Sequence, residues 1–247
     1  MKTIHFLSGY SRAGNTFLSS LINQNPNVIF TANSGAVDIV WKLACSYKTN
    51  WFENFPDKKG LENVMNNFFE NYYAHYNANI IFDRGGWGTP DNLGVLQTII
   101  KEPKFLLLVR PLNEVLASYV KLAKPENVSS FINELMHPDG GKIYWDWLST
   151  KNIIEKYKKN YLIIHYDSLI ENTQKSIDRI YEFFKIEPFS HDFNNIKQLE
   201  INGVKYDDKV FNIDLHTIRP FISKEKYAIS DYLPQDIINM YKNWDLF

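Results

Sequence analysis

The sequence predicts an α/β fold in three layers, α/β/α, with helices on both faces of a central, mainly parallel sheet. Two observations indicate this class. Short apolar runs alternate along the chain with longer amphipathic stretches, and the runs are apolar at consecutive positions, which is typical of strands buried on both faces. No repeat, low-complexity tract or proline-rich linker interrupts the pattern, so we expect residues 1–247 to form a single domain.

The apolar runs give five expected strands and the amphipathic stretches six expected helices. The strands are expected at residues 4–7, 28–31, 79–82, 104–109 and 161–165. The helices are expected at residues 16–23, 36–47, 61–75, 113–122, 143–157 and 173–184. Strands that alternate with helices in this order favour parallel crossover connections. Beyond Phe189 the periodicity weakens, and we expect residues 190–247 to wrap the sheet and to complete a nucleotide site at its edge.

The composition excludes several classes of protein. A formal net charge of -1 gives the chain no general attraction to nucleic acid or to an anionic membrane. The single cysteine, Cys45, excludes an internal disulfide framework, and its apolar, helical surroundings favour a buried structural role. The chain enters its first strand almost at once, without an apolar leader, and no run is long enough to span a bilayer. We therefore expect a cytoplasmic protein without nucleic-acid or membrane partners, of unknown oligomeric state.

A glycine-bearing loop connects the first strand to the first helix. Residues 9–16 read Gly-Tyr-Ser-Arg-Ala-Gly-Asn-Thr, which fits the phosphate-loop pattern GxxxxGK, followed by Ser or Thr, except that Asn15 replaces the lysine. Such a loop presents backbone N–H groups at the positive end of a helix dipole, which suits an anion. Arg12 supplies a cation within the loop, and its planar guanidinium can bracket one phosphate. The loop predicts a fold of the P-loop type, although taken alone it also fits a tight turn with a solvated arginine.

A second anion site is predicted after the fourth strand. Arg110 follows the apolar run of residues 104–109, and the carboxyl end of a parallel strand opens onto the crevice where α/β proteins bind ligands. Ser118 comes about two helical turns later, on the same side as Arg110. Together the two side chains can hold a second anion, whereas each judged singly fits an ordinary surface residue.

These segments resemble the sulfotransferases that use 3′-phosphoadenosine 5′-phosphosulfate (PAPS). Residues 9–18 resemble their Pro-Arg-Ser-Gly-Ser-Thr-Phe-Leu loop, and residues 109–119 resemble their 3′-phosphate motif with the same arginine-to-serine spacing. Residues 161–172 resemble the strand with a Tyr-Glu-Asp-like end that precedes a helix in the same enzymes. The three segments occur in family order, and residues 189–193 and 215–219 resemble the tail of a bacterial and phage subgroup. The resemblance therefore covers nearly the whole chain.

The resemblance implies transfer of a sulfuryl group from PAPS to a hydroxyl or amine of a small-molecule or carbohydrate acceptor, without a required metal. It also explains the missing lysine, because PAPS carries one 5′-phosphate beside the sulfuryl group and no β,γ pair. The residues that it assigns to the nucleotide are Arg12, Ala13, Gly14, Asn15 and Thr16 for the 5′-phosphosulfate, Arg110 and Ser118 for the 3′-phosphate, Tyr166 for the adenine region, and Arg219 as a further candidate for the 3′-phosphate. The departures from the family loop are Ser11 for proline, Ala13 for serine and Asn15 for serine or threonine.

Sulfuryl transfer also needs a group that takes the acceptor's proton and a cation that steadies the leaving phosphate. Arg12 fits the second role. No histidine follows the third strand, so Asp83, at its end, is the first candidate for the catalytic base and Asp38 the second. Asp83 equally fits a residue that caps the next turn or pairs with Arg84. His5 is expected to pack within the first strand, and His216 fits either a cofactor-side or a structural role.

The acceptor site is expected to use some of the aromatic side chains of the chain. The candidates are Trp41, Trp51, Phe52, Trp87, Tyr144, Trp145 and Trp147. Two other functions stay open. Residues 79–83 resemble the metal-binding strand of P-loop kinases and nucleotide triphosphatases, which leaves the Arg110 and Ser118 pair unexplained. A non-catalytic protein that keeps nucleotide binding also fits the altered loop.

Overall fold

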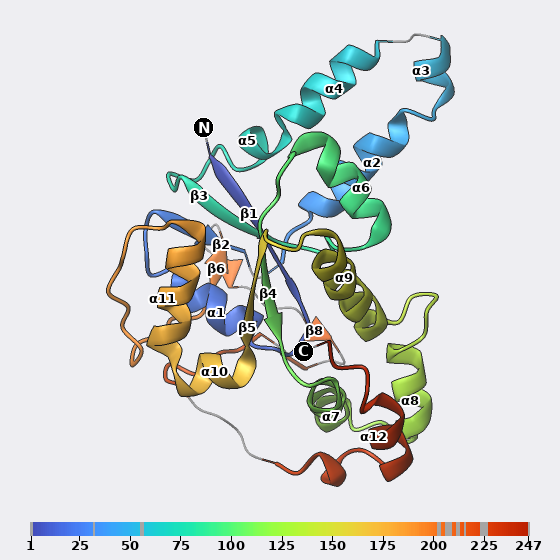
Figure 1. The fold of residues 1–247 in the computed structure, drawn as a ribbon, viewed down its shortest axis with the longest axis vertical. Coiled ribbons are helices and arrows are strands. Elements are labelled where there is room, and N and C mark those ends of the chain that lie inside the picture. The colour runs from blue at the N-terminus through green and yellow to red at the C-terminus, as the bar shows by residue number, and fades with distance from the viewer. Residues whose placement is uncertain are drawn as a thin grey trace.

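Five parallel strands form the central sheet of the protein in the computed structural model (Figure 1). The structure describes residues 2–31, 33–54, 57–201, 204–205, 209–210, 213–214, 216–222 and 227–246. The strands are β1 (Thr3–Gly9), β2 (Val28–Phe30), β3 (Ile80–Arg84), β4 (Phe105–Val109) and β5 (Tyr161–His165), in the spatial order β2-β3-β1-β4-β5. All five predicted strands and the α/β class are confirmed. Because every pairing is parallel, the carboxyl ends of the strands share one edge of the sheet.

Helices cover both faces of this sheet. They are α1 (Asn15–Ile22), α2 (Ala36–Ser46), α3 (Asn50–Asn54), α4 (Lys58–Asn66), α5 (Phe68–Tyr72), α6 (Pro90–Ile99), α7 (Leu112–Ala123), α8 (Val128–Leu135), α9 (Lys142–Lys156), α10 (Tyr166–Glu171), α11 (Thr173–Phe184), the 3-10 helix η1 (Ile229–Asp231) and α12 (Gln235–Tyr241). The predictions for α1, α2, α7, α9 and α11 are confirmed. The stretch predicted as one helix at 61–75 is divided between α4 and α5, because Asn67 has a φ of -100° and a ψ of 8° and interrupts the helix.

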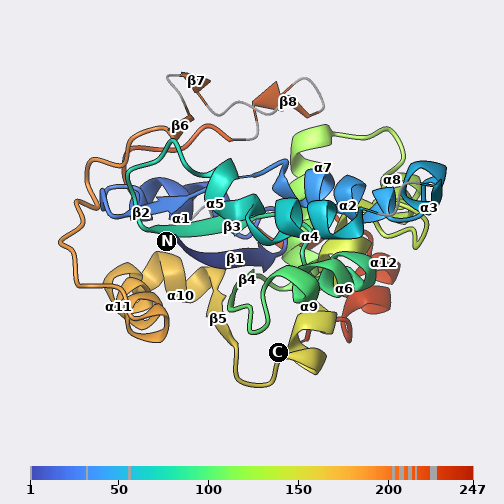
Figure 2. The same cartoon turned by 90° about the horizontal axis from the view of Figure 1, so that it is seen from above.

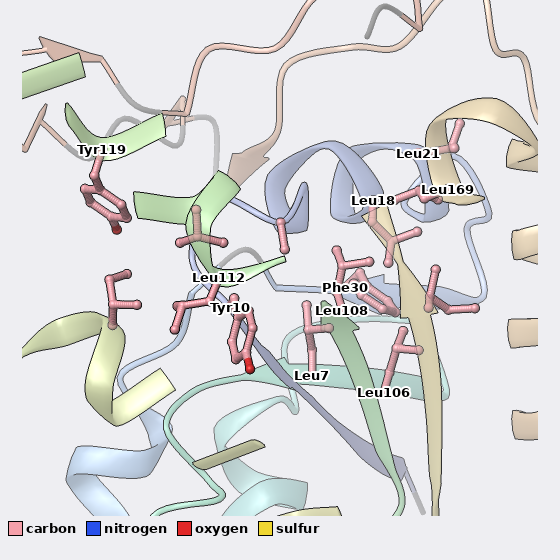
Figure 3. Packing of buried hydrophobic residues seen from close by; sticks show 14 of the residues in the cluster. Leu7, Tyr10, Leu18, Leu21, Phe30, Leu106, Leu108, Leu112, Tyr119 and Leu169 are labelled. Atoms are coloured by element: carbon pink, nitrogen blue, oxygen red, sulfur yellow. The ribbon is translucent and has the colours of Figure 1, made fainter. Parts of the chain in front are cut away.

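The core has two parts, one on each face of the sheet, because successive side chains of a strand point to opposite faces. On β1, Phe6 packs in the part that contains residues of α2, α6 and α9, and Leu7 packs in the part that contains residues of α1, α7 and α11. Figure 3 shows Leu7, Leu106 and Leu108 of the sheet near Leu18 of α1. All four leucines are 0% exposed. Each such side chain stabilises the fold by about 1.5–3 kcal/mol, so the sheet is a firm support for the loops at its edge.

Two predictions about single residues have opposite outcomes. His5 packs inside β1 as expected, since it is 5% exposed and its ring lies 5.1 Å from that of Phe82 and 4.6 Å from that of Phe184. The prediction that Cys45 is buried is wrong, because its side chain is exposed. Helix α2 turns only its first part toward the core, through residues such as Val40, and Cys45 lies near the other end.

The chain after α11 returns to the body of the protein at several places. Beside α1, the Gln24 side chain accepts a hydrogen bond from the backbone N–H of Asp192 (2.7 Å) and donates one to its carbonyl (2.9 Å). The short strand pairs β6 (Glu200–Ile201) with β7 (Val204–Lys205) and β8 (Lys209–Val210) with β9 (Ile213–Asp214) follow, and Figure 2 shows β6, β7 and β8 at the top, apart from the central sheet. Helix α12 then reaches α7, where Asn113 Nδ2 donates to the Ile238 carbonyl (3.1 Å). None of the helices in the described ranges has the length and the hydropathy of a membrane span.

Candidate active site

A cavity of about 470 Å³ opens at the carboxyl ends of the strands. Its wall comes from the loop after β1, the chain after β3, Arg110 and the second half of α7, the first turns of α9, Tyr166 at the start of α10, and described residues of the tail between 216 and 227. Arg12, Gly14, Asn15, Thr16, Arg110, Ser118, Tyr166 and Arg219 of the sequence prediction all line it. Ala13, which was predicted with them, is 0% exposed and packs in the core beneath the loop. Segments far apart in the sequence thus meet at one site.

The loop after β1 has a backbone that depends on its glycines. Gly9 and Gly14 have φ values of 126° and 91°, and between them Arg12 has a φ of 65°. A Cβ on Gly9 would lie 2.2 Å from the carbonyl oxygen of Leu108, because β1 pairs with β4 at this point. A Cβ on Gly14 would lie 3.2 Å from the ring of Tyr166. Left-handed residues of this kind shape the loop into the concave arrangement that binds anions ahead of a helix N-terminus.

Asn15 stabilises the loop from within. Its side-chain Nδ2 donates a 2.8 Å hydrogen bond to the carbonyl of Tyr10, and the residue is 5% exposed. The position that carries a phosphate-binding lysine in triphosphatases therefore carries a buried amide that closes the loop on itself. The positive charge of the loop comes from Arg12, which lines the cavity.

Arg12 and Ser118 lie in contact although they are 106 residues apart. Arg12 Nε donates to Ser118 Oγ at 3.3 Å, so the cation of the loop reaches the serine of α7. Burial lowers the pKa of Arg12 from its usual value, and the positive charge of Arg110 acts in the same direction. An arginine pKa starts so high that the group keeps its charge near neutrality.

Arg110 is held by four neighbours. Its Nε donates to Glu114 Oε2 (2.9 Å), Nη1 to the Arg12 carbonyl (3.3 Å) and Nη2 to Tyr227 OH (3.4 Å), while its guanidinium lies 4.5 Å from the ring centre of Tyr166. Burial by itself lowers the pKa of Arg110, but the neighbouring Tyr227, Glu114 and Tyr166 groups together raise it above its usual value. The side chain is thus a fixed cation between the loop and α10.

The tail reaches the phosphate loop directly. Thr16 Oγ1 and His216 Nδ1 are 2.6 Å apart, which joins the first turn of α1 to a residue 200 positions later. Ile218 and Arg219 also line the cavity. Leu215, the first residue of the tail segment noted in the sequence, lies outside the described residues. His216 therefore has a cavity-side position.

Asp83 is not among the residues that line the cavity. Its side chain is 0% exposed and accepts hydrogen bonds from Ser34 Oγ (2.8 Å), Trp87 Nε1 (2.7 Å) and Tyr73 OH. Burial raises the pKa of Asp83, although the three donors act against that shift. The expectation that Asp83 opens onto the crevice does not match this position, because the hydrogen bonds from Ser34, Tyr73 and Trp87 hold its side chain inside the core. Asp38 is exposed on α2 and does not line the cavity either.

Sequence reasoning missed several residues of the cavity wall. Asp146 of α9 lines it and accepts a 2.7 Å hydrogen bond from the backbone N–H of Ser11 through Oδ2. Lys121 lines it too, and its Nζ lies 4.8 Å from the ring centre of Tyr227. Lys121 could have been found, since it follows Ser118 by three residues on the same helix face. No local pattern marks Asp146, because only the packing of α9 on β1 brings it to the loop.

Among the aromatic candidates for the acceptor site, Trp145 is the one in the described lining of the cavity, with 37% of its surface exposed. Trp87 is fully buried, and Trp147 packs against Trp244 with ring centres 4.7 Å apart. Phe221, from the tail, is a further aromatic residue of the cavity and is 54% exposed. The two most exposed aromatic residues of the described cavity wall therefore come from α9 and from the tail.

Comparison with known proteins identifies the family. The sequence model of the sulfotransferase domain matches residues 2–228. The chain has no match among curated protein sequences. Among solved structures it is similar to mouse sulfotransferase SULT7A1 complexed with PAP (TM-score 0.59, 14% identity, 98% of this chain and 82% of that one). It is also similar to a sulfotransferase from Alicyclobacillus acidocaldarius (0.53, 10%, 78% and 84%) and to the sulfotransferase domain of the Synechococcus PCC 7002 olefin synthase (0.51, 12%, 100% and 88%). The chain belongs to the sulfotransferase domain family.

Proposed function

We propose that the protein transfers a sulfuryl group from PAPS to a hydroxyl or amine of a small-molecule or carbohydrate acceptor, releasing PAP and a sulfated product. The observation that carries this proposal is the pairing of two cationic positions in one cavity. Arg12 stands in a phosphate loop without its lysine, and Arg110 stands beside it with Ser118 and an aromatic ring, that of Tyr166. A nucleotide with a single 5′-phosphate group, a second phosphate on its ribose and a flat base suits this arrangement.

Each part of the nucleotide has a proposed place. Backbone N–H groups of the loop from Ala13 to Thr16 and the Arg12 guanidinium bind the 5′-phosphosulfate, although the Ala13 side chain itself packs in the core. Arg110 and Ser118 bind the 3′-phosphate, and Tyr166 contacts the adenine region. Arg219 and the rest of the tail complete the site over the nucleotide, which makes the segment 190–247 part of one functional unit with the sheet.

Arg12 is proposed to act in the chemical step as well as in binding. As the acceptor oxygen bonds to sulfur, the bond between sulfur and the 5′-phosphate oxygen breaks, and negative charge grows on that oxygen. A guanidinium fixed next to the loop stabilises the growing charge more than the charge of the ground state, which accelerates transfer. Its contact with Ser118 links this step to the site of the 3′-phosphate.

The position of Asp83 weighs against the kinase or triphosphatase alternative. In such enzymes the carboxylate after this strand holds Mg²⁺ beside the phosphates. Here Asp83 is fully buried, accepts three hydrogen bonds from protein groups and does not line the cavity. The Asn15 side chain likewise donates its hydrogen bond to the Tyr10 carbonyl and carries no charge for a phosphate.

A thermal-shift series with PAP, PAPS, ATP, and ATP with Mg²⁺ tests the proposal. A ligand at a hundred times its Kd stabilises the native state by about 2.7 kcal/mol. We expect PAP and PAPS to raise the Tm without added metal and ATP with Mg²⁺ to raise it much less. A larger shift with ATP and Mg²⁺ would favour the triphosphatase alternative. Binding of PAP without transfer of labelled sulfate to a broad panel of sugars, phenols and amines would favour the non-catalytic alternative.

A further inference from the structure

The described part of the cavity wall contains one carboxylate, on helix α9. Among the described residues that line the cavity, Asp146 is the only aspartate or glutamate. An acceptor hydroxyl or amine has to lose a proton as it is sulfated, and a positioned carboxylate can take that proton. We propose that Asp146 is the general base of the transfer reaction. This inference rests on the proposed function, and it replaces Asp83 and Asp38 in that role.

The anchoring of α9 fixes the position of Asp146. Ser149 Oγ lies 3.1 Å from Ser8 Oγ of β1, and Thr150 Oγ1 donates to the Asp146 carbonyl at 2.8 Å. A Cβ on Gly88 would lie 2.2 Å from the Ser149 carbonyl oxygen, so α9 also packs closely on the chain that follows β3. The first turns of α9 are therefore held beside the phosphate loop.

The order of the sheet separates the two ends of the site. The proposed nucleotide contacts run from the loop after β1 to Arg110 after β4 and Tyr166 after β5, while β3 lies on the other side of β1. Arg84 at the end of β3 and the two glycines that follow it, residues 85 and 86, line the cavity together with Asp146 and the accessible Trp145. An acceptor that approaches the sulfuryl group opposite the leaving phosphate enters on this side, next to the Asp146 carboxylate.

A hydrogen bond from the backbone of the loop also fixes the position of the Asp146 carboxylate. The family loop has proline where this chain has Ser11, and proline has no N–H to donate. Ser11 is 5% exposed, and its N–H is satisfied by Asp146 Oδ2. An ionised carboxylate has two oxygens and about four acceptor positions, so one hydrogen bond to the loop leaves capacity for an acceptor proton. The same bond ties the base to the loop that holds the reacting sulfate.

The electrostatic surroundings suit proton transfer. Burial raises the pKa of Asp146, whereas the Ser11 hydrogen bonds and the positive charges of Arg84 and Lys142 act against that shift. Burial raises the pKa of Tyr10 in the loop, and the negative charges of Asp245 and Asp146 act in the same direction. In the reaction the acceptor oxygen forms its bond to sulfur, the bond from sulfur to the 5′-phosphate breaks, and PAP leaves with the electron pair. The acceptor proton passes to the Asp146 carboxylate and then to solvent.

His216 is the histidine among the described residues of the cavity wall and is therefore a second candidate for the general base. Its Nδ1 lies 2.6 Å from Thr16 Oγ1, and Thr16 is in the first turn of α1, where the 5′-phosphosulfate is proposed to bind. His216 therefore stands at the nucleotide end of the site rather than beside the residues after β3. This position favours a contact between His216 and the nucleotide. The variant His216→Asn therefore separates the role of His216 from that of Asp146.

The test compares Asp146→Asn, Asp146→Glu and the matched control Glu155→Gln. Asparagine keeps an oxygen that can accept the Ser11 N–H but lacks the basicity, and Glu155 is an exposed carboxylate on the same helix. We expect Asp146→Asn to bind PAP in calorimetry as the wild type does and to lose about a hundred- to ten-thousandfold in kcat for transfer from labelled PAPS to sugar hydroxyls. Asp146→Glu should recover part of the loss, and Glu155→Gln should show none.

The reverse reaction gives a second readout. With PAP and p-nitrophenyl sulfate the departing group is a stable phenolate that needs no proton, so Asp146→Asn should lose far less in this direction than in the forward one. Equal losses in PAP binding and in both directions would mean that Asp146 only supports the loop and would overturn the inference. Full forward activity in Asp146→Asn, or a larger kcat loss in His216→Asn, would overturn it as well. A wild-type protein that fails to bind PAP would instead refute the proposed function, and the base with it.

Discussion

Arg110→Ala should weaken PAP binding by about ten- to a hundredfold. The Arg110 side chain is 10% exposed and is oriented by Glu114, so its cation is already positioned when a nucleotide arrives. Its two Nη contacts, to the Arg12 carbonyl and to Tyr227 OH, are long at 3.3 and 3.4 Å and can give way to a phosphate. A hydrogen bond to a charged group contributes about 1.5–3 kcal/mol, and each 1.4 kcal/mol is a factor of about ten in Kd.

The assay is calorimetry with two ligands, PAP and adenosine 5′-phosphosulfate, because the second lacks the 3′-phosphate. Arg110→Ala should reduce the affinity for PAP and leave that for adenosine 5′-phosphosulfate nearly unchanged. Arg110→Lys should fall between, since it keeps the charge without the planar fork. Arg179→Ala, at an exposed position on α11, is the matched control and should change neither. Equal losses for both ligands would refute the assignment of Arg110 to the 3′-phosphate.

Three further variants test separate parts of the structure. Asn15→Lys should not create Mg²⁺-dependent ATP hydrolysis, since Asp83, the carboxylate at the metal-binding position of triphosphatases, is buried and does not line the cavity. A phosphate-release assay that detects such hydrolysis would favour the triphosphatase alternative. Asp83→Asn should lower the free energy of unfolding in urea by about 1–3 kcal/mol, because one of the two acceptor oxygens becomes an amide NH2 that cannot accept from its buried donors, and should keep turnover per folded molecule. A hundredfold loss of turnover at unchanged stability would return Asp83 to the role of base. His5→Leu should make the free energy of unfolding less sensitive to acid. Burial lowers the pKa of His5 to about 4, so the unfolded chain binds more protons than the folded chain between pH 6.5 and 4. The wild type therefore loses up to about 3 kcal/mol of its free energy of unfolding as the pH falls across that window. If urea denaturation showed that variant and wild type lose the same free energy of unfolding between pH 6.5 and pH 4, the prediction would be contradicted.

The sheet could be predicted from the sequence because each strand is a short apolar run. Residues 105–109 are buried at every position, so their pattern has no period that could be mistaken for a surface helix. The helices were predictable where an amphipathic stretch was long. The division of residues 61–75 into two helices could not be predicted, because the break at Asn67 depends on backbone angles that no residue type in that stretch dictates.

The loop after β1 and the Arg110 to Ser118 pair could be predicted to line one cavity, because both are local patterns beside a predicted strand. The surroundings of Asp83 could not be predicted, since its donors Ser34 and Tyr73 come from segments 49 and 10 residues away. The place of Asp146 in the cavity wall could not be predicted for the same reason, because 135 residues separate it from Ser11. Local sequence indicates which loop and which cations suit an anion, whereas the contacts that determine the burial and the partners of a carboxylate come from the packing of distant segments.

The loop keeps its shape because its unusual residues have gained specific partners. Ser11 brings an N–H that proline lacks, and Asp146 accepts it; Asn15 lacks the charge of lysine, and its amide closes the loop on the Tyr10 carbonyl. Thr16 keeps its hydroxyl, which meets His216 of the tail. These contacts tie the loop to α9, to itself and to the tail, so a change at any of them acts through the whole cavity. The loop therefore has a backbone fixed by specific contacts in place of a lysine, and the guanidinium groups of Arg12 and Arg110 beside it are the positions that we propose for the 5′ and 3′ phosphates of the nucleotide.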